Sequence, residues 1–209
     1  MISVLFPTIR PELVAPCLES IRAGAGGVPF EVIVVSDVPV TWELQPWVRW
    51  IVTARNGVVD AVNVAYRAAR GSYVFLTNDE TRIEPLALER LYQAALREPQ
   101  AIWSPQHIPS YPFFYYGKPF VPFVFASKAL LDSLGGLLDP AYKGFYADPD
   151  LSMRAHAAGV PLRVLDTAVI HHSNNIGRPD HVAAVQQYLA QDRETFRARW
   201  DHLGEFCDP

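Results

Sequence analysis

The acidic residues that follow an apolar run near the middle of the chain could bind a metal ion. The run covers residues 73–76, and Thr77-Asn78-Asp79-Glu80 comes directly after it. Mg²⁺ and Mn²⁺ prefer oxygen ligands, and few protein ligands are enough when phosphate oxygens complete the coordination shell. Asp79 is therefore a candidate metal ligand. The same residues are also typical of a turn, and Arg82 could pair with the carboxylate instead.

A second candidate for chemistry is the acidic pair in Asp148-Pro149-Asp150. A carboxylate at the start of a helix can face a cleft and accept a proton from an alcohol, which is the work of a general base. The structural alternative is a helix cap. Asp148 would then be the N-cap residue and Pro149 the first helical residue, with Asp150 in the first turn, where the helix dipole favours an acidic group.

A third candidate is the histidine pair His171-His172, which follows an apolar run. Histidine binds metals and carries protons near neutral pH. Adjacent residues of a strand point to opposite faces, so we expect only one of the two to serve a given site. His171 could equally be a core histidine whose ring is hydrogen-bonded.

The elements that must position these residues alternate along the first half of the chain. Continuous apolar runs predict buried strands, and apolar residues at helical spacing predict the helices between them. This order indicates a parallel sheet with helices on both faces, and ligands bind beyond the carboxyl ends of such strands. The predicted strands cover residues 2–6, 31–35, 50–53 and 73–76, and the predicted helices cover 11–23, 57–70 and 84–97.

The second half of the chain differs in character. Residues 103–125 hold five prolines and the aromatic cluster Tyr111-Pro-Phe-Phe-Tyr-Tyr, which predicts an irregular segment with exposed aromatic rings. Such a segment is either a loop packed on the core or a wall on which a ring-shaped ligand stacks. Beyond it we expect helices over 127–134, 148–158 and 180–200 and a strand over 162–165.

Composition limits the class of protein. The chain has 209 residues, of which 50% are hydrophobic, and a net charge of −4. These values exclude a disordered tail and argue against a nucleic-acid partner. No apolar run approaches the roughly 20 residues of a membrane span, and residues 1–5 lack the basic start of a signal peptide. We therefore expect one cytoplasmic domain.

Taken together, these pieces resemble the family 2 glycosyltransferases with the GT-A fold, in their rhamnosyltransferase-like branch. The most specific block combines Gly135-Gly136 and Asp139 with a later run that contains Asp148, Asp150 and Arg154. Asn78-Asp79 stands where the family has its metal motif. The other resembling blocks are Ile2-Ser-Val-Leu-Phe-Pro-Thr with Arg10, Glu31-Val-Ile-Val-Val-Ser-Asp, Asn56-Gly57 with Asn63, and Ile170-His171.

The resemblance implies a fold and an activity. The fold is a single Rossmann-like, mostly parallel sheet flanked by helices, with a small antiparallel extension on the acceptor side. Residues 1–104 would bind the nucleotide sugar, 105–178 the acceptor, and 179–209 would form a closing helix. The activity is metal-dependent, inverting sugar transfer from a UDP- or dTDP-linked donor to a glycan or glycoconjugate. The oligomeric state stays open, with a homo-oligomer as one alternative.

The resemblance also assigns roles to residues. Asp148 would be the catalytic base, while Asp79 and His171 would hold Mn²⁺ or Mg²⁺. Two positions depart from the family pattern, because Thr77 replaces the first acidic residue of the metal motif and Ala147 replaces a glutamate. The nucleotide would contact Pro7, Thr8, Arg10, Asp37, Asn56, Asn63 and Asn78, and the acceptor would contact Asp150, Tyr146 and Tyr115.

Two other functions stay open from the sequence. Thr77 and Ala147 suit a degenerate domain that binds a nucleotide sugar or a glycan without turning it over. A sugar nucleotidyltransferase has the same kind of sheet, but its phosphate loop is rich in glycine. Residues 7–16 contain no glycine, which argues against that activity.

Overall fold

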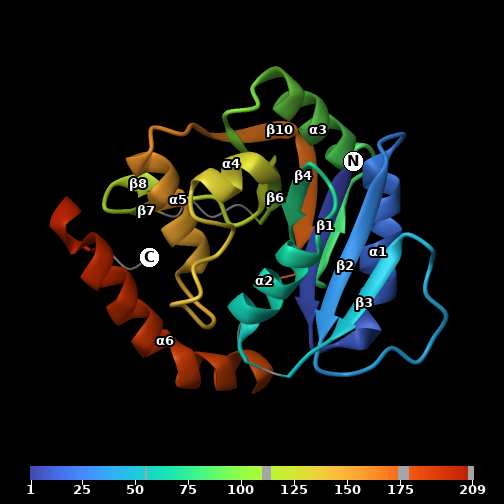
Figure 1. The fold of residues 1–209 in the computed structure, drawn as a ribbon, viewed down its shortest axis with the longest axis horizontal. Coiled ribbons are helices and arrows are strands. Elements are labelled where there is room, and N and C mark those ends of the chain that lie inside the picture. Colours follow the sequence, from blue (N-terminus) through green and yellow to red (C-terminus); the bar gives the residue numbers. More distant parts are fainter. Residues whose placement is uncertain (55, 110–113, 174–178, 207–209) are drawn as a thin grey trace.

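The protein's structure, a computed structural model, describes residues 1–54, 56–109, 114–173 and 179–206 (Figure 1). Within these residues eight strands form one sheet. They are β1 (Ile2–Thr8), β2 (Phe30–Ser36), β3 (Val48–Val52), β4 (Tyr73–Leu76), β5 (Thr81–Ile83), β6 (Ile102–Ile108), β9 (Val124–Ser127) and β10 (Leu162–His172). Their spatial order is β3-β2-β1-β4-β9-β6-β10-β5.

The first half of the chain builds a parallel sheet, as its pattern predicted. β1 lies between β2 and β4 and pairs with both in parallel, and β3 pairs in parallel with β2. The runs in these strands are apolar on both sides because helices cover both faces. Apolar side chains of α1 (Pro11–Ala25) and α3 (Ala87–Arg97) pack on one face, and those of α2 (Val58–Ala68) pack on the other.

The second half is more regular than predicted, because β6 and β9 lie within or beside the segment that we expected to be irregular. β6 pairs in parallel with β10 and includes Pro105, which lies opposite Leu165. A proline lacks an N–H group but is tolerated in a strand where no N–H is needed. Long-range pairing therefore outweighs the local signal of the prolines. β9 pairs antiparallel with β4, and β5 antiparallel with β10, so the sheet is mixed.

β10 is longer than predicted. We expected it to end at Leu165, but its register shifts between Leu165 and Val169 and the strand then continues. A bulge of this kind lets a strand bend without ending. Both His171 and His172 consequently lie inside the strand, opposite Arg82 and Thr81 of β5.

Three further helices cover the second half: α4 (Lys128–Ser133), α5 (Ala147–Ala157) and α6 (Pro179–Trp200). The Ser127 side chain caps α4, as the sequence indicated, by accepting a hydrogen bond from the Leu130 N–H at 3.2 Å. α5 begins one residue earlier than predicted, after Tyr146 in a left-handed conformation with φ of 60°. Asp148 is therefore not the N-cap residue but lies within the first turn.

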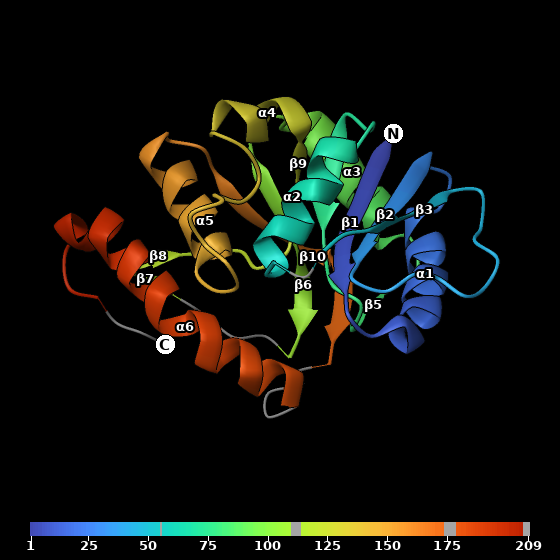
Figure 2. The ribbon, with the colours of Figure 1, turned by 60° about the horizontal axis from the view of Figure 1, so that its bottom comes forward.

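A small antiparallel sheet of β7 (Phe114–Tyr115) and β8 (Lys118–Pro119) confirms the predicted extension. Figure 2 shows α6 running beside α5 and across the lower end of the molecule, beyond the tips of β6 and β10. Of the helices in the described ranges, none combines the length and the low polarity that a bilayer crossing requires.

Candidate active site

The candidate site lies at the carboxyl ends of the parallel strands. Contacts of the loop before α5 place the start of that helix at the same edge. The backbone N–H of Val59, at the start of α2, donates to the Lys143 carbonyl at 3.2 Å. Gly57, which follows β3, has φ of +90°, and a Cβ there would lie 2.4 Å from the same oxygen. Glycine is therefore required at this close approach.

Asp79, the predicted metal ligand, is 2% exposed and follows β4. Its Oδ2 atom accepts a hydrogen bond from the Thr8 hydroxyl at 2.6 Å. The Arg10 guanidinium donates to Oδ1 through Nη2 at 2.5 Å and to Oδ2 through Nε at 3.3 Å. Burial raises the pKa of Asp79, while the Thr8 and Arg10 contacts oppose the rise. Arg10 also forms an ion pair with Glu80.

Asn78, predicted to bind the nucleotide, shapes the turn after β4. Its Oδ1 atom accepts hydrogen bonds from the Glu80 N–H at 3.2 Å and the Thr81 hydroxyl at 2.7 Å. Its Nδ2 atom lies 2.9 Å from Nε2 of His172. The amide is thus engaged on both sides, and it links the turn to the last residue of β10.

The two histidines of β10 point to opposite faces, as strand geometry requires. His171, the predicted metal ligand, is exposed and its Nε2 lies 3.0 Å from Glu84, so the structure does not bring it to Asp79. His172 is half-buried against Asn78 and the Phe123 ring, and burial lowers its pKa. His172, and not His171, is therefore the histidine that contacts the turn at Asn78.

Asp148, the predicted base, is half-buried in the first turn of α5. Burial raises its pKa from an ordinary 3.8 to about 6, and a hydrogen bond from its own backbone N–H only partly opposes this rise. Within the described ranges no cation forms an ion pair with this carboxylate. The side chain is thus a partly desolvated acid that titrates just below neutral pH.

Asp150, predicted to contact the acceptor, is held by side chains of α5 and α6. It is fully buried, and Oδ2 accepts a hydrogen bond from Arg154 Nε at 2.8 Å. Its Oδ1 atom accepts hydrogen bonds from Arg199 Nη1 at 2.8 Å, Trp200 Nε1 at 3.0 Å and the Tyr142 hydroxyl at 3.2 Å. Asp150 therefore joins α5 to the end of α6.

Tyr115 and Tyr146, the other predicted acceptor contacts, are also buried. Their ring centroids each lie 5.2 Å from that of Phe196 on α6 and 5.8 Å from one another. Tyr115 and Tyr146 therefore pack α6 onto the domain. Phe114, which precedes Tyr115 in the aromatic segment, is 49% exposed. The first residues of the predicted wall, 111–113, lie outside the described ranges.

Asp192 is a site-shaping residue that the sequence reasoning missed. It is fully buried on α6, and its carboxylate accepts hydrogen bonds from the backbone N–H groups of Lys143, Gly144 and Phe145 at 2.8–3.2 Å. These residues lead into α5, so Asp192 fixes the loop before Asp148. A signal was present, because Asp192 falls on the apolar stripe that includes Phe196 and Trp200.

The other predicted nucleotide contacts divide into two groups. Pro7 and Asp37 are half-buried at the ends of β1 and β2, and Asn56 is exposed before α2, so all three lie at the edge of the sheet. Asn63 instead donates a hydrogen bond from Nδ2 to the Leu138 carbonyl at 2.9 Å. That bond ties α2 to the loop after α4.

A family model described as "Glycosyl transferase family 2" matches residues 3–135, well over half of the chain. The chain belongs to glycosyl transferase family 2. This membership agrees with the resemblance found in the motifs and argues against a nucleotidyltransferase. A comparison with curated protein sequences finds no match.

Solved structures show the same GT-A fold as this family 2 chain. The mannosyltransferase PcManGT from Pyrobaculum calidifontis, in complex with GDP-Man and Mn²⁺, is similar at a TM-score of 0.70 and 18% identity, over 99% of this chain and 65% of that one. S. aureus TarS 1–349 has a TM-score of 0.64 and 17% identity, over 96% of this chain and 74% of the TarS chain. GalNAc-T7 with UDP, GalNAc and Mn²⁺ has a TM-score of 0.69 and 11% identity, over 95% of this chain and 50% of the GalNAc-T7 chain. The family 2 chain thus spans less than two thirds of the PcManGT chain.

The side chains at the predicted metal site do not offer a divalent cation the oxygen ligands that it needs. Both oxygens of Asp79 are taken by Arg10 and Thr8. Thr77 occupies the other position of the motif, and its buried hydroxyl has no hydrogen-bond partner in the described structure. The described residues contain no group of three or more His, Cys, Asp or Glu placed to hold a metal ion.

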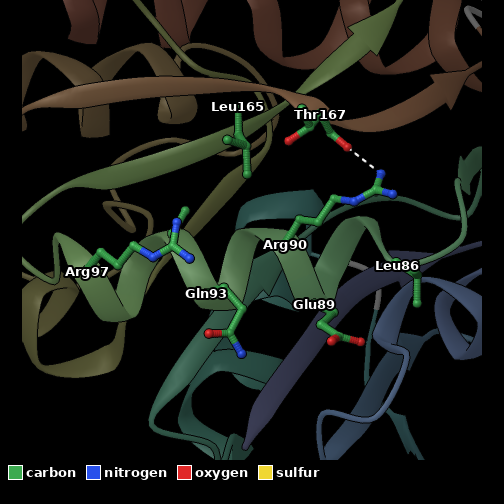
Figure 3. Close-up of a pocket in the computed structure, with 8 residues that line it drawn as sticks. Leu86, Glu89, Arg90, Gln93, Arg97, Leu165 and Thr167 are labelled. Atoms are coloured by element: carbon green, nitrogen blue, oxygen red, sulfur yellow. Dashed lines mark hydrogen bonds between the residues drawn. The ribbon is translucent and has the colours of Figure 1, made fainter.

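A surface pocket of about 380 Å³ lies elsewhere in this family 2 chain, between α3 and β10 (Figure 3). In it, Arg90 Nη1 donates a hydrogen bond to the Thr167 carbonyl at 2.6 Å. The pocket carries none of the predicted site residues, and we assign it no part in the chemistry. Its lining residues are Leu86, Glu89, Arg90, Gln93, Ala94, Arg97, Leu165 and Thr167.

Proposed function

We propose that this chain is an inverting glycosyltransferase that moves a sugar from a nucleotide-diphosphate donor to an acceptor hydroxyl group. The observation that carries the proposal is Asp148, a half-buried carboxylate with a pKa near 6 and no cationic partner in the described residues. GDP-Man bound to PcManGT and UDP-GlcNAc bound to TarS support a donor of this class.

The acceptor hydroxyl group needs a base because its pKa is too high for it to ionise at neutral pH. In the proposed reaction Asp148 takes the proton as the acceptor oxygen attacks the anomeric carbon. The bond from that carbon to the diphosphate oxygen breaks on the opposite face, so one displacement inverts the centre. A pKa of about 6 leaves Asp148 ionised at pH 7 and close to the operating pH. Positioned general bases contribute roughly 10²–10⁴ in rate.

The leaving group in this scheme is an anionic nucleoside diphosphate, and its charge must be balanced. Arg10 lies after β1 at the edge where donors bind, and a guanidinium group binds phosphate oxygens in a bidentate way. A positive charge placed where negative charge develops lowers the barrier. We assign Arg10 this role. No step of the scheme passes through a metal ion, because the described residues contain no group of three or more His, Cys, Asp or Glu placed to hold one.

A thermal-shift screen of nucleoside diphosphates and of UDP-, dTDP- and GDP-linked sugars tests donor binding. A ligand at about 100 times its dissociation constant should add about 2.7 kcal/mol to the free energy of unfolding. We expect one nucleotide class to stabilise both the wild type and Asp148→Asn, because the base does not hold the donor. No stabilisation by any member of the panel would contradict the proposal.

A second candidate is a domain that binds a nucleotide sugar without transferring it. The engaged carboxylate of Asp79 and the replacements Thr77 and Ala147 favour it. The two candidates differ in product formation. A chain that the donor stabilises, but that releases no nucleoside diphosphate with any acceptor tested, would be the binding domain.

A further inference from the structure

A second surface pocket, of about 170 Å³, lies between α1 and residues 37–47, the loop that joins β2 to β3. Figure 1 shows this loop beside α1, at the side of the sheet. Pockets for larger ligands typically measure about 300–1,000 Å³, so this one has room for a single ring rather than for a whole nucleotide sugar. The described residues that line it are Ala15, Leu18, Glu19, Arg22, Trp42, Glu43, Leu44, Gln45 and Trp47.

Two indole rings, those of Trp42 and Trp47, line this pocket. Trp42 is 38% exposed, although tryptophan is on average a well-buried residue. Its ring meets that of Trp50 at an interplanar angle of 81°, so the two rings are not stacked face to face. An exposed indole in a pocket offers a flat apolar surface, on which the C–H groups of a sugar ring can pack.

Polar side chains of both signs accompany the two indoles. Glu19 and Arg22 of α1 are largely exposed, and their ion pair is loose at 3.9 Å. A pair of this kind contributes little to stability, so both groups can turn to the hydroxyl groups of a ligand. Glu43 and Gln45 add further oxygen atoms that accept hydrogen bonds. The carboxylates outnumber the guanidinium group, which favours a neutral ligand over an anionic one.

Hydrogen bonds hold the loop in this shape before any ligand binds. Trp50 Nε1 donates to the Val38 carbonyl at 2.9 Å, and the Val38 N–H donates to Ser36 Oγ at 3.2 Å. At the other end of the loop, the Val48 N–H donates to the Gln45 carbonyl at 2.9 Å. A pocket that is already ordered loses less conformational entropy when it binds.

We propose that this pocket binds one sugar ring of a neutral glycan chain and holds that chain beside the active site. The inference rests on the proposed function, since it assumes a saccharide acceptor. α1 begins at Pro11, directly after Arg10, and Ala15 of the pocket lies about 6 Å further along the helix axis. A second contact on the same glycan raises the effective concentration of the acceptor at the active site.

The experiment is a titration of the donor-free, ¹⁵N-labelled protein with neutral hexasaccharides of glucose, mannose, galactose and N-acetylglucosamine, followed by NMR of the indole N–H groups. The chain has five tryptophans, and a Trp→Phe variant of each assigns its signal. One hexasaccharide should shift the Trp42 and Trp47 signals in a saturable way. The Trp103 signal, from an indole on β6 that donates to the Glu98 carbonyl, should stay in place.

Variants of Trp42 separate stacking on a ring from general apolar contact. Trp42→Leu keeps an apolar side chain but removes the flat ring, and it should weaken hexasaccharide binding by about 10-fold or more. Trp42→Phe keeps an aromatic face and should lose less. Leu96→Ala removes an equally exposed apolar side chain from α3 and should bind as the wild type does.

Three results would overturn the glycan site. They are no shift of the Trp42 signal with any hexasaccharide, equal affinity in the wild type and Trp42→Leu, and tighter binding of the anionic hexagalacturonate than of every neutral chain. The titration contains no nucleotide, so it is independent of the donor screen. A protein that binds a hexasaccharide at Trp42 but that no nucleotide stabilises would retain the glycan site and lose the proposed function.

Discussion

Replacing Asp148 by asparagine should make the protein more stable at neutral pH while it impairs transfer. Burial raises the pKa of Asp148 from 3.8 to about 6, so the folded state holds the proton more tightly than the unfolded state does. The stability that this group contributes is present below pH 3.8 and is lost as the pH rises through about 6. Asparagine has nearly the same shape and carries no charge to desolvate.

The size of the effect follows from the same two pKa values. The difference between 3.8 and about 6 corresponds to about 3 kcal/mol at about 1.36 kcal/mol per pKa unit. Asp148→Asn should therefore exceed the wild type by up to about 3 kcal/mol at pH 7.5. In a chain of this length that gain raises the melting temperature by about 6–12 °C. The advantage should shrink between pH 6 and pH 4 and vanish below it.

Urea unfolding of both proteins between pH 4 and pH 8 measures this difference. Asp166→Asn, which removes an exposed carboxylate from β10, controls for the loss of one negative charge. An Asp148→Asn protein that is less stable than the wild type, or whose stability difference does not change with pH, would refute the picture of a desolvated carboxylate.

The remaining predictions concern the elements that hold the site and its titration. Asp150→Ala should lower the free energy of unfolding by about 3–5 kcal/mol, because it leaves the largely buried charge of Arg154 without a carboxylate and leaves Arg199 with Asp139 alone; a loss below 1 kcal/mol would show that the network is dispensable. Asp192→Ala should cost about 1.5–3 kcal/mol and speed hydrogen exchange at residues 143–145, and unchanged exchange there would refute its hold on the loop. The kcat/KM of transfer should rise with pH up to about 6 and then level off, because Asp148 must be ionised to act as the base; a profile flat from pH 5 to pH 8 would contradict this.

The strands and helices of the first half could be predicted because their signals are local. Continuous apolar runs and helical stripes identified β4 with its observed ends, and identified β1 and β2 to within two residues. β5 and β6 could not be found in this way. β5 has three residues, and β6 contains Pro105, so both depend on pairing with distant β10.

The sequence singled out the acidic residues of the candidate site, but it could not give their surroundings. The sequence pointed to Asp79 and Asp148 as acids that follow a strand and start a helix. It could not show that Asp150 is buried, because two of its partners, Arg199 and Trp200, lie about fifty residues further along the chain. The choice of His172 over His171 depends on a register set by the bulge in β10.

The most direct test of the proposed function is the release of nucleoside diphosphate from the stabilising donor, measured by chromatography across a panel of saccharide acceptors. The wild type should release the diphosphate in step with a new glycoside of inverted anomeric configuration. When the donor site is occupied to the same extent, transfer by Asp148→Asn should be slower by a factor of roughly 10²–10⁴. Transfer by Asp148→Asn at the wild-type rate would contradict the central claim.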